Sequence, residues 1–165
     1  MKFVLIDKLT KLTPGQSAAA IKQLSLAEEY LADHFPAFPV LPGVLMVEAM
    51  VQTCAWLVRV TQNYAKSVIV LSEAKNVRYG TFVAPGDRMD VTCEATAINA
   101  DTSQFKAQCM VGDQTTARAQ LVLEHFNLAD RHPGWGEQDK KLIEHFRGQF
   151  KLLAGPEALT EKIQA

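Results

Sequence analysis

Residues 33–60, DHFPAFPVLPGVLMVEAMVQTCAWLVRV, decide the fold of this 165-residue chain. The first part, Asp33–Gly43, contains three prolines and is expected to be a loop, because proline lacks an N–H donor and fixes φ. The second part, Val44–Val60, is apolar nearly all round and predicts a helix buried inside a protein. It is short for a membrane span and carries polar side chains, so we expect no membrane crossing. Those side chains are Glu48, Gln52 and Arg59.

The residues before this stretch have the pattern of a hairpin. Phe3–Lys8 and Ser17–Leu24 are expected to be strands that pair through a turn at Pro14-Gly15. Ala27–Ala32 is expected to form a short helix that leads into the proline-rich loop.

After the helix the apolar period changes from 3.6 to 2. Ser67–Tyr79 is a predicted strand, and three alternating segments follow it with short breaks suited to hairpins. This pattern predicts an antiparallel meander with one dry face. The dry face of this sheet must be buried, and the helix must be covered on most sides. Both requirements are met if the sheet curls around the helix, which is an α+β architecture. The three segments are centred on residues 90–97, 104–109 and 117–124.

The last part of the chain differs in character. Pro133–Gly136 breaks regular structure, and beyond it four apolar side chains fall on one helical face with charges opposite. We expect residues 1–126 to form one domain. Residues 127–165 are expected to be a helical extension that docks on the body or on a partner subunit and is not a separate domain. The four side chains are Leu142, Ile143, Phe146 and Phe150.

Composition indicates an ordinary soluble protein. The chain is 48% hydrophobic with a net charge of −1, which does not favour nucleic acid or an anionic membrane as a partner. The three cysteines, Cys54, Cys93 and Cys109, lack metal-ligand spacing and are expected to be buried free thiols. No histidine has ligand spacing either, so we expect no metal. The N-terminus reaches Asp7 before any signal-type apolar stretch, so a cytoplasmic location is expected.

Three groups suited to chemistry meet where the loop enters the helix. His34 lies in a loop restrained by Pro36 and Pro39, Gly43 starts the helix, and Glu48 is an acid inside an apolar helix. The first amides of a helix are unpaired and favour negative charge, which suits a substrate oxygen that gains charge during a reaction. Each residue also has a non-catalytic interpretation. His34 can be an ordinary polar surface residue, Glu48 can be a solvent-exposed position of the helix, and Gly43 can serve only to reverse the chain. Their combination favours a catalytic site. One turn beyond the acid, the side chain of Gln52 can hydrogen-bond the carboxyl.

These residues resemble a known family. The stretch Asp33–Gln52, DHFPAFPVLPGVLMVEAMVQ, is similar to the signature of the 3-hydroxyacyl-acyl-carrier-protein dehydratases of fatty-acid synthesis, which have the hot-dog fold. The resemblance runs from about Phe3 to Leu123 and includes NVRYGTFVAPGDRMDV in the later strands.

The resemblance implies a mechanism and an assembly. His34 would take the C2 proton, Glu48 would protonate the leaving hydroxyl, the Gly43 amide would polarise the thioester carbonyl, and Gln52 would be a supporting residue. It also implies no cofactor, a substrate on acyl carrier protein or coenzyme A, and a homodimer or a trimer of such dimers, with His and Glu from different subunits. The acid at 48 favours dehydration without isomerisation, since the isomerase branch usually has Asp there.

The chain departs from the family at four places. Ala37 replaces a usual Gly, and Gly80 and Thr81 replace a basic pair associated with carrier docking. The family's usual N-terminal His-Arg-Tyr-Pro-type segment does not occur in this sequence, and the tail after Phe126 has no counterpart. Two alternatives therefore stay open, a hot-dog thioesterase and a non-catalytic acyl-binding subunit. The thioesterase does not need the His-Phe-Pro loop, and retention of both His34 and Glu48 argues against the binding subunit.

Overall fold

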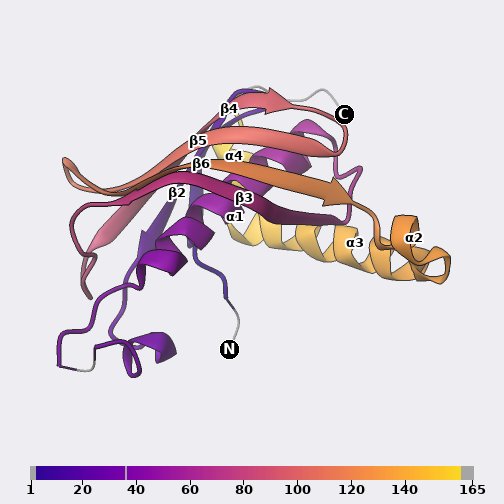
Figure 1. Cartoon of the computed structure of the whole chain (residues 1–165). Helices are drawn as coiled ribbons and strands as arrows, with labels where there is room; N and C mark the ends of the chain where they lie inside the picture. The colour runs from indigo at the N-terminus through magenta and orange to yellow at the C-terminus, as the bar shows by residue number, and fades with distance from the viewer. Residues whose placement is uncertain (1–2, 36, 161–165) are drawn as a thin grey trace.

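A curled sheet of six antiparallel strands wraps around one long helix (Figure 1). This computed structural model describes residues 3–35 and 37–160. The strand order is β1-β2-β4-β5-β6-β3. The strands are β1 (Lys8–Thr13), β2 (Ser17–Gln23), β3 (Val68–Tyr79), β4 (Arg88–Ile98), β5 (Thr102–Val111) and β6 (Gln114–Phe126). The helices are η1 (Glu29–Leu31), α1 (Gly43–Thr61), α2 (Leu128–Arg131), η2 (Pro133–Trp135), α3 (Gly136–Leu152) and α4 (Gly155–Ala158).

Helix α1 is the centre of the core. It contacts all six strands, and twelve of its residues are buried. The helix is long and apolar enough to cross a membrane, yet 72% of its most apolar stretch is buried inside the structure. An all-round apolar helix is explained by burial inside the fold. The α+β hot-dog fold predicted from the sequence is therefore confirmed.

The meander that packs on α1 is also as predicted. β4, β5 and β6 are consecutive neighbours, and most of their residues alternate between buried and more exposed. Because successive side chains of a strand point to opposite faces, one face of this sheet is dry and lies against α1. Cys54, Cys93 and Cys109 are buried free thiols in this core, as expected.

The strand predicted over Phe3–Lys8 is wrong, because β1 begins only at Lys8. A bulge after Leu9 breaks the alternation, so the buried Leu9 and Leu12 are three residues apart. The apolar residues of β1 therefore lack the period of two that predicts a strand. The residues before β1 are hydrogen-bonded to the central helix instead. The amide of Leu5 donates to Oε1 of Gln52 at 2.9 Å.

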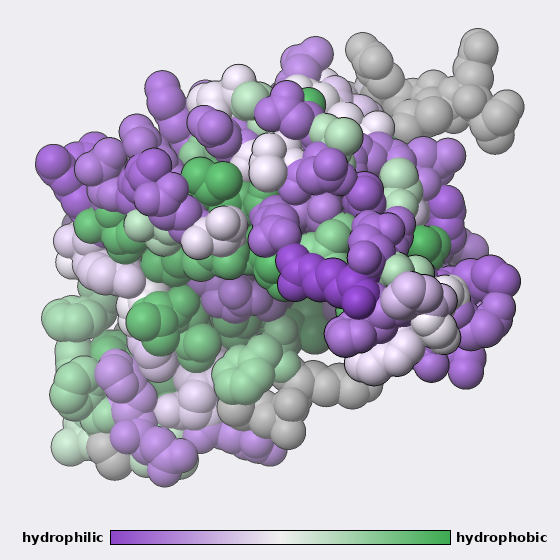
Figure 2. Space-filling view, turned by 45° about the vertical axis from the view of Figure 1, so that its right-hand side comes forward, coloured by the Kyte–Doolittle hydropathy of each residue, from purple (hydrophilic) through white to green (hydrophobic). Residues whose placement is uncertain are grey.

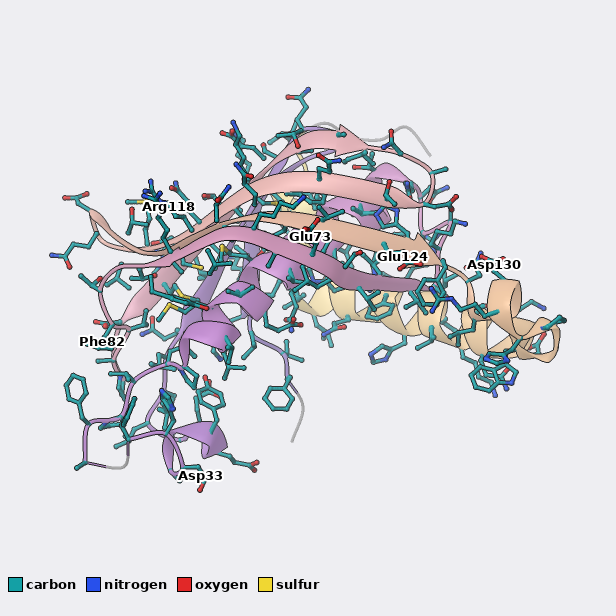
Figure 3. The ribbon with its side chains drawn as sticks, viewed as in Figure 1. Asp33, Glu73, Phe82, Arg118, Glu124 and Asp130 are labelled. Atoms are coloured by element: carbon teal, nitrogen blue, oxygen red, sulfur yellow. The ribbon has the colours of Figure 1, made fainter. Side chains whose placement is uncertain are left out.

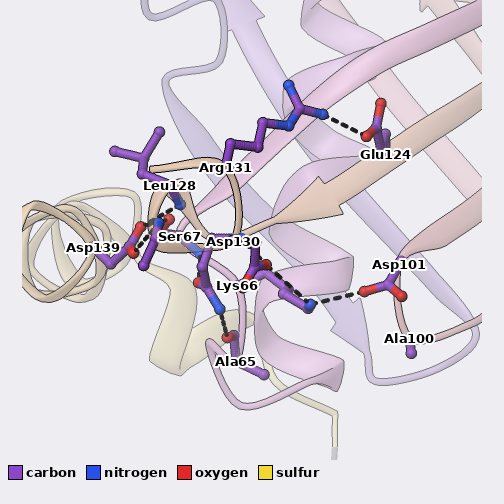
Figure 4. Close-up of polar contacts among 12 residues, drawn as sticks. Ala65, Lys66, Ser67, Ala100, Asp101, Glu124, Leu128, Asp130, Arg131 and Asp139 are labelled. Atoms are coloured by element: carbon purple, nitrogen blue, oxygen red, sulfur yellow. Dashed lines mark hydrogen bonds and ion pairs between the residues drawn. The ribbon is translucent and has the colours of Figure 1, made fainter. Parts of the chain in front are cut away.

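Asp139 of α3 fixes the C-terminal segment to the sheet (Figure 4). Its carboxylate accepts hydrogen bonds from the amides of Leu128 at 2.8 Å and Ala129 at 3.0 Å and from the hydroxyl of Ser67. Burial opposes ionisation of Asp139, but these three donors outweigh it and hold the pKa of the carboxyl below its usual range. The start of α3 is thus tied to the residue before β3.

Aromatic side chains then pack α3 against α1. The Phe150 ring lies 5.8 Å from the Trp56 ring and 6.5 Å from the Tyr64 ring, measured between centroids. Phe146 contacts Trp56 edge-on at 6.0 Å. Phe150 and Leu153 belong to the main core cluster. The helix expected in this segment therefore covers α1 of its own chain.

Deleting residues 137–165 is expected to lower the melting temperature by roughly 10 °C. The deletion uncovers Trp56 and removes Phe150, and burial of a large aromatic side chain stabilises by about 3–5 kcal/mol. Thermal denaturation measures the change, and size-exclusion chromatography detects altered assembly. The control is Lys140→Ala on the exposed side of α3, which should leave both unchanged. An unaltered melting temperature and oligomer size in the deletion variant would contradict the expectation.

Stability is expected to fall in mildly acidic solution because of His125. This β6 side chain is 1% exposed. Burial lowers the pKa of its imidazole, although neighbouring Asp101 acts in the opposite direction. Because the unfolded chain has a histidine pKa near 6.5, it binds a proton that the folded chain resists, and the free energy of unfolding decreases below that pH.

Melting temperatures measured between about pH 7 and pH 5 test this expectation. They should fall with pH in the wild type and fall less in His125→Phe, which keeps a buried ring without a titratable group. Asp139 acts in a separate window, since its stabilisation is lost only below the unfolded value near 3.9. Equal slopes in the two proteins would show that His125 is not responsible.

Candidate functional site

The loop that carries His34 projects from the sheet at the N-terminal end of α1 (Figures 1 and 3). His34 is half-buried, its amide donates to the Tyr30 carbonyl at 3.2 Å, and its ring lies 4.4 Å from the Phe35 ring. Phe35 has a φ of 52°, a left-handed conformation that turns the chain at this point. Pro36, one of the residues expected to restrain the loop, lies outside the described residues.

Two contacts hold the rest of the loop against the segment between β3 and β4. The amide of Leu41 donates to the Val83 carbonyl at 2.9 Å. The Phe38 ring meets the Phe82 ring edge-on at 5.7 Å, and Figure 3 labels Phe82 beside the projecting loop. The imidazole of His34 is therefore presented by a loop with its own tertiary anchors.

Gly43 is the first residue of α1, as expected. The first amides with an intrahelical partner are those of Leu45 and Met46, which donate to the Pro42 carbonyl at 2.9 and 3.3 Å. The amides of Gly43 and Val44 precede this ladder, so they are donors at the positive end of the helix dipole. A Cβ at Gly43 would lie 2.8 Å from the Tyr79 ring, so glycine permits this close approach.

Glu48 and Gln52 lie one turn apart on α1 and are hydrogen-bonded. Nε2 of Gln52 donates to Oε1 of Glu48 at 3.0 Å and to the Phe3 carbonyl at 2.9 Å. With the bond from Leu5 already described, Gln52 is fixed on both ends of its amide. The half-buried carboxylate of Glu48 is thus oriented by a side chain that cannot turn freely.

Glu48 opens onto a cavity of about 1190 Å³ between α1 and α3. Among the residues that the structure describes, those lining it include none from the loop residues 33–35 and 37–42. Within one chain, the structure therefore brings Glu48 and Gln52 together but does not bring His34 to the same cavity. The lining comprises Phe3, Val4, Glu48, Val51, Gln52, Ala55, Trp56, Arg59, Ile69, Lys141, Glu144, His145, Phe146, Gly148, Gln149, Leu152 and Leu153.

Arg59 also lines this cavity, although the sequence pattern indicates it only as a charge against a membrane span. Its spacing was nevertheless a signal, since Glu48, Gln52, Ala55 and Arg59 recur at intervals of three or four residues and therefore share one face of a helix.

The structure explains why glycine occupies position 80, where the family that the chain resembles usually has a basic residue. The amide of Gly80 donates to the Thr116 carbonyl at 2.8 Å, and a Cβ there would collide with the Thr115 carbonyl oxygen. The basic residues nearby lie instead on the outer face of the sheet (Figure 3), where Arg78 pairs in register with Arg118. They line a separate depression of about 620 Å³.

Within residues 3–35 and 37–160, no three His, Cys, Asp or Glu side chains are grouped so that they could hold a metal ion.

Comparison with known proteins identifies relatives. Residues 1–120 match the FabA-like domain. The 3-hydroxyacyl-[acyl-carrier-protein] dehydratase FabZ of Syntrophomonas wolfei is 36% identical over 120 residues, which cover 73% of this chain and 83% of that protein. FabZ of Gluconobacter oxydans is 36% identical over 119 residues, covering 71% and 70%.

Solved structures with low sequence identity share the fold. The dehydratase heterocomplex ApeI:P from Xenorhabdus doucetiae matches with a TM-score of 0.66 and 15% identity over 77% of this chain and 86% of that one. A mutant thioesterase, PA1618 from Pseudomonas aeruginosa, matches with a TM-score of 0.55 and 15% identity over 69% and 77%. The same architecture therefore occurs in both dehydratases and thioesterases, and the fold alone does not choose the reaction.

Proposed function

Since the chain belongs to the FabA-like family and is a 3-hydroxyacyl-[acyl-carrier-protein] dehydratase of fatty-acid synthesis, we propose that His34 and Glu48 are its base and acid. His34 removes a proton from C2 of a (3R)-3-hydroxyacyl thioester. The electron pair forms the C2–C3 double bond as the C3–O bond breaks, and Glu48 protonates the departing hydroxide to give water and a trans-2-enoyl thioester. No cofactor takes part and the double bond is not moved.

Gly43 and Gln52 support this reaction. The Gly43 amide donates to the thioester oxygen, where negative charge grows as the C2 proton leaves, and a helix start is suited to stabilise it. Gln52 holds the carboxyl of Glu48 through the 3.0 Å hydrogen bond. The observation that carries the proposal is this fixed acid on α1 beside a cavity large enough for an acyl chain.

The complete site is proposed to form between two subunits. The described lining of the cavity at Glu48 does not include the loop of His34, which favours a base supplied by a second subunit. β3 is an edge strand with Val70 and Leu71 about two-fifths exposed, and Figure 2 shows hydrophobic side chains gathered in a recessed band on one face. A second copy would satisfy this open edge and cover the apolar side chains. The assembly is a homodimer, or a trimer of such dimers.

We further propose that residues 1–126 are the dehydratase domain and that residues 127–165 extend it. The location is cytoplasmic. The substrate is carried by acyl carrier protein, with coenzyme A as the alternative carrier.

The test is incubation with 3-hydroxyacyl thioesters on each carrier. Dehydration yields a conjugated enoyl thioester, whose ultraviolet absorbance is followed, and hydrolysis yields a free thiol. Enoyl product on at least one carrier supports the proposal. Thiol release without enoyl product would identify a thioesterase. Formation of neither product would indicate an acyl-binding subunit without catalytic activity.

A further inference from the structure

The cavity at Glu48 continues along the helix as far as Arg59. The two residues are eleven positions apart, three full turns, so they lie on the same face about 16 Å from one another at about 1.5 Å per residue. Val51, Ala55 and Trp56 line the groove between them. An apolar floor bounded by Glu48 at one end and by a guanidinium at the other suits a chain with a polar group at each end.

The opposite wall of this groove is α3. Its lining residues include Lys141, His145, Gly148 and Leu152, and all of them follow residue 120, where the match to the FabA-like domain ends. The helix is held in place by Asp139 and by the aromatic contacts already described. This wall is therefore an addition to the family fold and gives the groove a shape of its own.

Arg59 is 7% exposed, and no side-chain hydrogen bond or ion pair within residues 3–35 and 37–160 involves it. Its Nε is enclosed without an acceptor. The guanidinium carbon lies 3.8 Å from the centroid of the Phe146 ring and 5.2 Å from that of Trp56. Burial lowers the pKa of Arg59 to about 10, so it remains charged at neutral pH.

A buried cation usually has a counter-ion, because the free energy lost when the cation leaves water is larger than the free energy gained from stacking on aromatic rings. Its place in the last turn of α1 and the aromatic contacts offset part of that cost. The other carboxylate that lines the groove, Glu144, is exposed and forms no ion pair with Arg59 among the described residues. Arg59 therefore lacks an anionic partner among the described residues, at the end of the groove away from Glu48.

We propose that this groove holds the acyl chain of the substrate and that Arg59 binds an anionic group at the end of the chain opposite the thioester. The preferred substrates are then long 3-hydroxyacyl thioesters with a terminal carboxylate. The substrate class rests on the proposed function, whereas binding of an anion-ended chain at Arg59 does not.

Binding is tested first, without catalysis. Trp56 contacts Arg59, so its fluorescence reports occupancy once Trp135 is replaced by Phe. Dodecanoate should bind at least about 10-fold more tightly than dodecanol, the worth of a charge-assisted hydrogen bond. Arg59→Met keeps the apolar stem and should bind both equally. Equal affinities in the protein with Arg59 present would overturn the proposal, even if the dehydratase is active.

Gly148 offers a second variant that leaves Arg59 untouched. It lines the groove, and a Cβ there meets no atom within 4 Å, so Gly148→Leu should fill the groove without strain. We expect it to weaken dodecanoate binding at least about 10-fold, since the chain then loses its apolar contacts. The matched control is Gly136→Leu, also open at Cβ in α3 but outside the groove, which should bind normally. Loss in both variants, or in neither, would contradict the placement.

Turnover is the third readout. Wild-type kcat/KM should favour carboxylate-ended over methyl-ended 3-hydroxyacyl thioesters of equal length, and Arg59→Met should lose that preference. An equal loss on both series would overturn the role of Arg59. Absence of enoyl product from every thioester would instead refute the proposed function and leave the binding result to stand by itself.

Discussion

Replacing Glu48 by Gln is expected to reduce kcat for dehydration by on the order of 10²-fold or more, the usual effect of a positioned acid. The fold should survive, because the amide has nearly the same shape and its oxygen can still accept the hydrogen bond that Glu48 receives from Gln52. Enoyl formation measures the rate and thermal denaturation measures the fold. The matched control is Glu144→Gln, an exposed acid on the same cavity, which should turn over normally.

The base is tested in the same way. His34→Ala should lose a similar factor, because neutral imidazole is the proposed acceptor of the C2 proton. A half-buried loop side chain contributes little packing, so the melting temperature should change little. Asp33→Asn, the adjacent exposed residue, is the control. Near-normal turnover in either Glu48→Gln or His34→Ala would remove that residue from the mechanism.

Mixing these two inactive variants is expected to restore activity to about a quarter of the wild-type level. If each site takes His34 from one subunit and Glu48 from the other, a mixed dimer has one intact site and one site with both lesions. Random reassortment makes about half of the dimers mixed, which gives the quarter. The motive is structural, since the cavity at Glu48 does not include the loop of His34 in the same chain.

The mixture needs two controls. Mass spectrometry confirms that subunits exchange, and mixing either variant with the double variant His34→Ala/Glu48→Gln should restore nothing, because no intact site can form. Exchange without recovery in the first mixture would refute the two-subunit site and leave the chemistry of each residue open.

The central helix, the meander and the motif could be predicted from the residues alone. Val44–Val60 is apolar nearly all round, and a helix of this kind is stable only when most of its surface is buried in the interior. The alternation in β4, β5 and β6 and the short breaks between them are local features, so they could be read directly. The family was evident from the residues around His34 and Glu48 and is confirmed by the match over residues 1–120. The first strand could not be read in the same way, because the bulge after Leu9 breaks its period.

The distribution of the site residues in space, in contrast, could not be predicted without the folded structure. Thirteen residues lie between His34 and Glu48 in the sequence, yet His34 is on a projecting loop that is not part of the described lining of the cavity at Glu48. The apolar face of α3 predicted that it must be covered, but not by what, because a hydrophobic stripe is non-directional and fits any apolar surface of suitable shape. Its docking on α1 created the groove and buried Arg59 beside Phe146. Such a contact joins residues far apart in the chain, and no local pattern encodes it.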